Sequence, residues 1–411
     1  MTKHNYFDKK TARDVPLDGQ TVLLRADYNV PLDEHGAIAD DYRMTQSLPT
    51  LEYLLNERHV GLVICAHLGR PEGVDPKLSL EPVVTHLAEL LQRPVKFVSE
   101  CIGDKVRVAT KNLKPGEVVL LENLRFHKQE EANDPVFAKQ LALDSHARYF
   151  VQDGFGDAHR AHASMVAITQ FLPSVGGLLI EREYQHILGA IHAPKRPLLT
   201  ILGGAKIADK LPLIDRFIGL ADHIVIGGAM ANTFLQYKGF NVGTSLVEPH
   251  EKQTIERIYK DAAAKVGENA VDGFLVLPTD VAVATDQHAK QPRKEVKLGN
   301  VHDKEMILDL GIDSAKAIEG LIKQAGTVIW NGTLGYAEAP QFMAASEHVA
   351  AALARQPETT SIIGGGDTAD FVLKWDSKKG KSFSLVSTGG GASLELMSGK
   401  KLPGVEALLD A

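Results

Sequence analysis

Glycine-rich segments follow short apolar runs through the second half of this 411-residue chain. Glycine lets backbone N–H groups approach a phosphate closely, and the N-terminus of a following helix adds the positive end of its dipole. These segments lie at residues 202–206, 226–228, 330–332, 364–368 and 388–391. The second half therefore has the groups needed to hold a polyphosphate.

Arginines and histidines take the corresponding places in the first half. The arginines are Arg25, Arg43, Arg70, Arg125 and Arg160, and His67 stands among them. Guanidinium groups bind carboxylates and phosphates with bidentate geometry, and burying them without an anion is costly. Solvation in a loop would explain any one of them, but an anionic ligand explains the set better. The two halves together predict transfer of a group between two ligands.

Two lysines follow the first glycine turn of the second half. Lys206 and Lys210 are four residues apart, so they share one face of the expected helix and could both reach a phosphate. The alternative is a tight turn with two solvated lysines. The turn matches neither a Walker A motif nor the G-x-G-x-x-G dinucleotide fingerprint.

Carboxylates that could serve a nucleotide occur in the same half. Asp367 follows a predicted strand and heads a predicted helix at 368–374, so it could bind the magnesium of a nucleotide, with Thr368 beside it. The alternative is an ordinary helix N-cap. Glu338 could accept hydrogen bonds from a ribose, or be a solvated surface residue. The N–H groups of residues 389–391 form a candidate anion nest.

The histidines of the first half do not predict a metal site. His159 and His162 flank Arg160, and a cation between two metal ligands is electrostatically unfavourable.

The elements that carry these residues alternate between strand and helix. Apolar runs with little polar alternation, typical of strands buried on both faces, occur at 21–26, 61–66, 95–99, 118–122, 148–152, 197–202, 223–226, 274–277, 328–330, 361–363 and 384–386. Amphipathic helical stretches intervene, for example at 45–57 and 80–91. This order predicts an α/β protein with parallel, doubly wound sheets, in which ligands bind beyond the carboxyl ends of the strands. The pattern breaks at 172–177, so we expect two domains, at 1–174 and 175–399.

Composition restricts the possible partners. The net charge is -7, so we expect neither nucleic acid nor an acidic membrane surface as a partner. Cys65 and Cys101 are too few for a disulfide framework. Residues 1–14 lack the apolar core of a signal peptide, and no stretch is long enough to span a membrane. We therefore expect a cytoplasmic protein.

The chain resembles the phosphoglycerate kinase family over nearly its whole length. The resemblance rests on R-A-D-Y-N-V-P (25–31), H-L-G-R-P (67–71), E-N-L-R-F-H (122–127), A-H-R-A-H (158–162), L-G-G-A-K (202–206), G-G-G-D-T (364–368) and S-T-G-G-G (387–391). It implies two Rossmann-like domains joined by a hinge, with the tail 400–411 returning to the first domain. It also implies a monomeric enzyme that acts on 1,3-bisphosphoglycerate or 3-phosphoglycerate and on ADP or ATP with Mg²⁺.

The resemblance implies roles for individual residues. Substrate is implied to meet Asp27, Asn29, Arg43, His67, Arg70, Arg125 and Arg160, with Arg43 facing the carboxylate that carries the moving phosphoryl group. Nucleotide and magnesium are implied to meet Lys206, Lys210, Glu338, Gly365, Gly366, Asp367 and Thr368. Lys206, Lys210 and the N–H groups of Gly389, Gly390 and Gly391 are implied to contact the transferred group, and with Arg43 they form the implied catalytic set. Transfer then needs the two domains to close on both ligands.

Several positions depart from the family's usual pattern. Thr333 replaces a proline, Tyr336 and Ala337 replace Val-Phe, and Asp157 replaces a threonine before A-H-R. The last change adds a negative charge near the anion site. Two other functions remain as alternatives: a nicotinamide-dependent dehydrogenase, disfavoured by the missing fingerprint, and a non-catalytic nucleotide-binding module, disfavoured by the intact arginine set.

Overall fold

The computed structural model describes residues 5–286 and 293–411. The chain forms two compact units: unit 1 is Met1–Gln185 with Lys400–Ala411, and unit 2 is His186–Gly399. The division lies within helix α6 (Leu178–His192), not after residue 174 as the sequence pattern suggested. The difference arises because the interruption at 172–177 contains a short strand, β6 (Ser174–Gly176), that pairs with β5 (Tyr149–Gln152) in the sheet of unit 1.

Unit 1 is built on a six-stranded parallel sheet with the order β3-β4-β2-β1-β5-β6. With β6, its strands are β1 (Thr21–Arg25), β2 (Gly61–Cys65), β3 (Val95–Val98), β4 (Val118–Leu121) and β5 (Tyr149–Gln152). Side chains of one strand point alternately to the two faces, so Val22 and Leu24 enter one apolar core and Leu23 enters the other. The two-sided burial explains why these strands read as continuous apolar runs.

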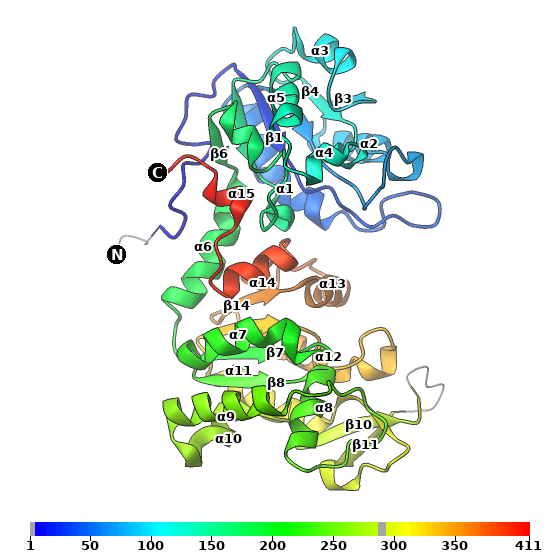
Figure 1. Ribbon diagram of the computed structural model, residues 1–411, viewed down its shortest axis with the longest axis vertical. Coiled ribbons are helices and arrows are strands. Elements are labelled where there is room, and N and C mark those ends of the chain that lie inside the picture. Colours follow the sequence, from blue (N-terminus) through cyan, green and yellow to red (C-terminus); the bar gives the residue numbers. More distant parts are fainter. Residues whose placement is uncertain (1–4, 287–292) are drawn as a thin grey trace. The chain divides into compact units, whose positions relative to one another are not determined.

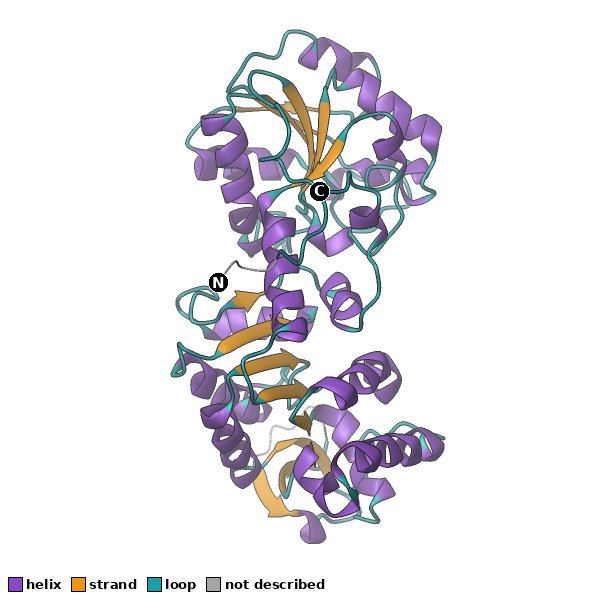
Figure 2. Ribbon diagram, turned by 90° about the vertical axis from the view of Figure 1, so that its left-hand side faces the viewer, coloured by secondary structure: helices purple, strands orange, loops and turns teal. Residues whose placement is uncertain are grey.

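Helices cover both faces of this sheet (Figure 2). They are α1 (Tyr42–Glu52), α2 (Glu81–Leu91), α3 (Asp104–Thr110), α4 (Lys128–Glu131) and α5 (Pro135–Asp144). Met44 of α1 and Leu87 of α2 belong to the same core as Val22, whereas Val106 of α3 and Phe137 of α5 belong to the core of Leu23.

Unit 2 repeats this architecture with the strand order β15-β14-β13-β7-β8-β9, again all parallel. The strands are β7 (Leu198–Leu202), β8 (His223–Ile226), β9 (Leu275–Val276), β13 (Thr327–Asn331), β14 (Thr360–Gly364) and β15 (Leu385–Val386). The helices are α7 (Ile207–Leu220), α8 (Gly228–Tyr237), α9 (Lys252–Val266), α10 (Val271–Phe274), α11 (Ile312–Gln324), α12 (Ala344–Ala354), α13 (Gly366–Trp375) and α14 (Gly391–Met397). Figure 1 labels most of them. The prediction of two α/β domains with parallel sheets is confirmed.

A second, smaller sheet in unit 2 was not predicted. It is antiparallel, with the order β11-β10-β12, and consists of β10 (Asp280–Ala284), β11 (Lys294–Lys297) and β12 (Met306–Leu310). The edge strand β11 has the polar sequence KEVK, which carries no strand signal of its own.

The C-terminal tail belongs to unit 1 and contains the short helix α15 (Pro403–Glu406), red in Figure 1. Backbone hydrogen bonds attach the tail to the rest of unit 1. The Gly404 N–H donates to the Ala158 carbonyl at 2.9 Å, and the Leu409 N–H donates to the Ser174 carbonyl at 3.0 Å. The Lys9 ammonium also pairs with the Asp410 carboxylate at 2.6 Å. Across the described part of the chain, no helix is long and apolar enough to cross a membrane.

The buried carboxyl of Asp153, just after β5, should make stability depend on pH. Burial raises its pKa to about 7 from 3.8, although its Oδ1 accepts the Leu179 N–H at 3.1 Å. The folded state thus keeps a proton that the unfolded chain releases, so this stabilisation is complete below about pH 4 and is lost as pH rises through about 7.

Asp153→Asn removes this titration and should therefore gain stability relative to the natural chain as pH rises. From the two pKa values, the gain between pH 5 and pH 8 is about 3 kcal/mol. Urea unfolding of both proteins at the two pH values measures it. Equal pH dependence in the two proteins would contradict the prediction.

Candidate active site

The anion-binding candidates of unit 1 lie just beyond the carboxyl ends of neighbouring strands. Arg25 ends β1, His67 follows β2, Arg125 follows β4, and Asp157 follows β5. These four strands are adjacent and parallel, so their carboxyl ends meet at one edge of the sheet. Local sequence fixes each strand end, and the sheet order brings the ends together.

Asp157 is the centre of this cluster. Its Oδ2 lies 2.8 Å from His67 Nδ1 and 3.1 Å from Arg25 Nη2, and its Oδ1 lies 3.5 Å from Arg125 Nη2. All four side chains are almost fully buried. Burial opposes ionisation of Asp157, but the hydrogen bond from His67 and the two guanidinium charges hold its pKa well below the usual value. Burial lowers the pKa of His67, and Arg25 Nη2 also lies 3.2 Å from its Nδ1.

Arg25 is also linked to a second buried carboxylate, that of Glu130, through the hydroxyl of Ser164. Its Nε donates to Ser164 Oγ at 2.9 Å, and that hydroxyl donates to Glu130 Oε1 at 2.6 Å. The Ser164 N–H also donates to Glu130 Oε2, at 2.9 Å. Sequence reasoning missed both Ser164 and Glu130, because neither residue type signals chemistry where it stands.

Asp27, Asn29 and Arg43 form a second group on the same edge. Arg43 Nη1 donates to Asp27 Oδ2 at 2.7 Å, and the Asp27 charge raises the pKa of Arg43. Asn29 Oδ1 accepts the Gly69 N–H at 2.9 Å, which ties the loop after β1 to the loop after β2. A Cβ at Gly156 would lie 2.1 Å from Asp27 Oδ2, so glycine is needed beside this carboxylate.

The other two arginines predicted for the anion site lie outside the buried cluster. Arg70 is exposed and makes no ion pair or hydrogen bond within residues 5–286 and 293–411. Arg160 is half-buried, and its Nε lies 3.3 Å from the His159 ring.

In unit 2, the turn after β7 is closed against the turn after β13. The Gly203 N–H donates to the Asn331 carbonyl at 2.9 Å, and the Gly204 N–H donates to the Thr333 carbonyl at 3.2 Å. A Cβ at Gly203 would lie 2.1 Å from the Thr333 oxygen. The two turns therefore approach so closely that only glycine fits.

The two lysines after this turn differ in their surroundings. Lys206 is the exposed N-cap residue of α7. Lys210 is half-buried, and its ammonium donates to Asn331 Oδ1. Burial lowers the pKa of Lys210. Asn331 is fully buried, and its Nδ2 has no partner in the described part of the chain. Sequence reasoning noted the W-N-G segment but gave Asn331 no role.

Helix α13 begins at Gly366, two residues before the start predicted from the sequence. Gly365 is its N-cap residue with φ 86°, a left-handed conformation that glycine adopts without strain. The exposed Asp367 lies in the first turn of the helix, so the N-cap alternative for it is wrong. Thr368 is buried, and its hydroxyl accepts the Gly332 N–H at 2.6 Å.

A cavity of about 420 Å³ lies between these turns and the smaller sheet. Its polar lining includes Asp367, Glu338 and Thr333, together with Gly204, and apolar walls come from residues such as Leu310. The predicted nucleotide residues Asp367 and Glu338 thus line one cavity, together with Thr333 and Tyr336, two of the positions that depart from the family pattern.

One N–H group of the anion nest predicted at residues 389–391 already makes a hydrogen bond within the protein. The Gly389 N–H donates to Ser387 Oγ at 3.0 Å. Gly390 adopts a positive φ of 48°, and α14 begins at Gly391.

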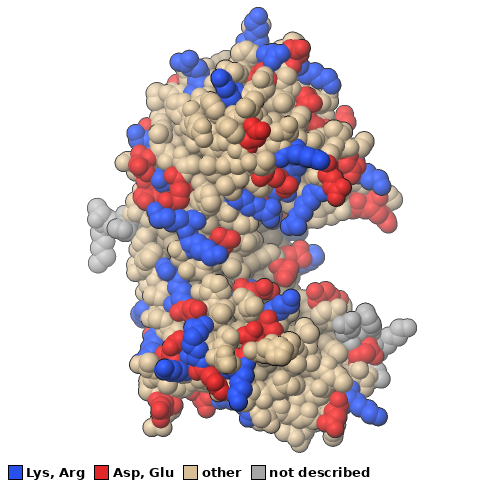
Figure 3. Space-filling model, viewed as in Figure 1, with Lys and Arg blue, Asp and Glu red and all other residues tan. Residues whose placement is uncertain are grey.

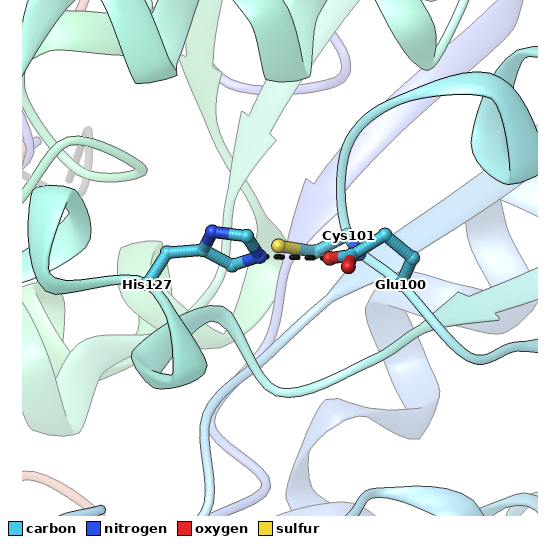
Figure 4. Close-up of side chains that lie close together, drawn as sticks. All are labelled: Glu100, Cys101 and His127. Carbon is cyan, nitrogen blue, oxygen red and sulfur yellow. Dashed lines mark hydrogen bonds and ion pairs between the residues drawn. The ribbon is translucent and has the colours of Figure 1, made fainter. Parts of the chain in front are cut away.

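Among the residues that the structure describes, one group of side chains has the composition of a metal site. Glu100, Cys101 and His127 place one ligand atom each within 4.8 Å of one another (Figure 4). His127 Nε2 and Glu100 Oε1 already pair at 2.7 Å, and burial raises the pKa of the Cys101 thiol well above its usual value. The group is therefore explained as a hydrogen-bonded link between the loops after β3 and β4. His159 and His162 do not belong to it.

On the face drawn in Figure 3, acidic and basic side chains are interspersed. The cations of the unit 1 cluster are almost fully buried.

Comparison with known proteins gives one consistent result. The family model described as phosphoglycerate kinase matches residues 12–400. Phosphoglycerate kinase of Nostoc sp. is 44% identical over 411 residues, covering 98% of this chain and 100% of the relative. That of Moorella thermoacetica is 43% identical, covering 98% and 99%. The solved structure of phosphoglycerate kinase from Coxiella burnetii has a TM-score of 0.84 at 32% identity, covering 97% of this chain and 98% of that one.

Proposed function

The chain belongs to the phosphoglycerate kinase family, and from this premise we propose how its two units share the reaction. The family transfers a phosphoryl group reversibly between 1,3-bisphosphoglycerate and ADP, giving 3-phosphoglycerate and ATP. The chain is therefore a kinase acting on a carboxyl group, as the sequence predicted, and the alternatives of a dehydrogenase and a non-catalytic module are set aside.

We propose that unit 1 holds the phosphoglycerate and unit 2 holds the nucleotide. The proposal rests on the contrast between the two sheet edges: buried cations gather beyond the strands of unit 1, whereas glycine turns and a cavity lie beyond the strands of unit 2. His67, Arg70, Arg125 and Arg160 would bind the phosphate that is not transferred. Arg43, held by Asp27, would face the reacting carboxylate.

On the nucleotide side, Glu338 would accept hydrogen bonds from the ribose at the rim of the cavity. Lys206 and Lys210 would bind the phosphates, with Gly365 to Thr368 and the N–H groups of Gly389 to Gly391 around them. Phosphoryl transfer depends on positioning and charge neutralisation, which explains why no covalent nucleophile is needed.

Asp367 suits a nucleotide-bound Mg²⁺. It is exposed on the cavity, and within the described part of the chain its carboxylate has no ion-pair partner, so it is free to coordinate. Magnesium bound there would neutralise charge on the phosphate oxygens.

The proposal predicts ATP formation from 1,3-bisphosphoglycerate and ADP by the purified chain, and predicts that the reaction stops when EDTA removes Mg²⁺. A coupled assay that reports ATP measures both effects, with restoration by added Mg²⁺ as the control. Folded protein that binds ADP at saturating Mg²⁺ but shows no turnover would contradict the proposal and favour a binding module.

A further inference from the structure

We infer that the Asp157 carboxylate is an internal anion that competes with the substrate's non-transferred phosphate for the same donors and thereby sets substrate affinity. This inference rests on the proposed function, which assigns His67 and Arg125 to that phosphate.

The carboxylate is bound as a ligand would be. Three donors from three different strand ends, on His67, Arg25 and Arg125, lie 2.8–3.5 Å from its two oxygens. Such convergence of guanidinium and imidazole donors is the usual way in which a protein binds a phosphate or carboxylate. Here the anion is supplied by the chain itself.

Few donors of the cluster remain for a second anion. Arg125 Nη1 donates to the Gly69 carbonyl at 2.8 Å, and Arg25 Nη1 donates to the Ala26 carbonyl. Within the described residues, Arg125 Nε makes no hydrogen bond but is ion-paired with Glu131 at 3.3 Å. Arg25 Nε is bonded to Ser164. A phosphate that reaches His67 and Arg125 must therefore displace Asp157 or lie beside it.

Lying beside it is unfavourable, because two anions would share a buried site in which charges are weakly screened. Displacement is also unfavourable, because it breaks the contacts of Asp157 with Arg25 and His67. Either way, part of the substrate's binding free energy is lost to Asp157, and removal of its charge should tighten binding.

The fold does not depend on Asp157 as the only counter-ion of Arg25. Glu130, fully buried, reaches Arg25 through Ser164, with distances of 2.9 Å and 2.6 Å along the chain of hydrogen bonds. Asparagine at position 157 keeps an oxygen that can accept from His67. Asp157→Asn should therefore fold.

The experiment compares Asp157→Asn with the natural chain by calorimetric titration of inorganic phosphate and of 3-phosphoglycerate. We expect dissociation constants at least about tenfold lower in the variant for both ligands, equivalent to one charge–charge contact of about 1.4 kcal/mol. Asp157→Glu, which keeps the charge, should bind both ligands as weakly as the natural chain does. Asp144→Asn is the matched control, since Asp144 is a buried carboxylate of unit 1 paired with Arg107 at 2.8 Å, away from the cluster.

Unchanged or weaker binding of both ligands by Asp157→Asn would overturn the inference and make Asp157 a residue that positions the cations. Asp157→Thr gives a second neutral variant, and failure of both neutral variants to fold would also overturn it, because Asp157 would then be a required counter-ion. The titration with inorganic phosphate tests the competition by Asp157 even if the assignment of 3-phosphoglycerate as substrate is wrong. If phosphate binds more tightly but 3-phosphoglycerate binds to neither protein, the substrate assignment fails and the competition stands.

Discussion

Replacement of Arg43 by alanine should lower kcat by about 10²–10³-fold with a smaller effect on KM for the phosphoglycerate. The reason is that this guanidinium is proposed to face charge that develops on the reacting carboxylate, so its contribution is largest in the transition state. Its one hydrogen bond within the described residues is to Asp27, at 2.7 Å, and the side chain is 31% exposed, so its other donors can reach a ligand.

Steady-state kinetics of a matched series tests this role. Arg125→Ala should raise KM and leave kcat less affected, because the phosphate that it is proposed to bind does not react. Arg13→Ala is the control, since Arg13 is an exposed arginine of unit 1 with a single carboxylate partner, Glu181. If both Arg43→Ala and Arg125→Ala raise KM and leave kcat intact, the role assigned to Arg43 is wrong.

The sequence predicted which residues gather at one sheet edge wherever the position of a residue depends on a strand end. Arg25, His67 and Arg125 follow apolar runs that are clear in the sequence, and the parallel order of the sheet brings them together. The same reasoning located the glycine turns of unit 2. Short-range pattern was sufficient in these cases because the strands are buried on both faces and therefore apolar throughout.

The pairing of side chains could not be predicted in the same way. Asp157 was seen only as an added charge, and nothing local shows that its oxygens lie between His67 and two arginines. The Ser164–Glu130 contact is likewise a product of tertiary packing. In the smaller sheet, β11 has a polar sequence, so its pairing with β10 and not its composition makes it a strand.

Gly203→Ala should damage unit 2 more than any surface change in that unit. The new Cβ would lie 2.1 Å from the Thr333 oxygen and 2.6 Å from the Gly332 oxygen, which are backbone atoms that no side-chain rotation can move. The turn that must shift also carries Asn331, the partner of Lys210, and the Gly332 N–H that donates to Thr368. The substitution therefore displaces the groups proposed to surround the nucleotide phosphates.

We expect Gly203→Ala to cost at least about 3 kcal/mol, the upper end of the usual cost of overpacking. For a unit of 214 residues (186 to 399), this lowers Tm by roughly 6–12 °C. ADP should bind at least about tenfold more weakly, a change of about 1.4 kcal/mol, because the displaced turn carries groups proposed to surround its phosphates. Calorimetric scanning and ADP titration measure the two effects. Gly219→Ala is the matched control: Gly219 lies in α7 with no atom within 4 Å of an added Cβ, so the alanine should leave Tm equal or slightly higher. A Gly203→Ala protein with the Tm and ADP affinity of the natural chain would show that the turns after β7 and β13 can separate without loss, and that their close approach is not what shapes the nucleotide site.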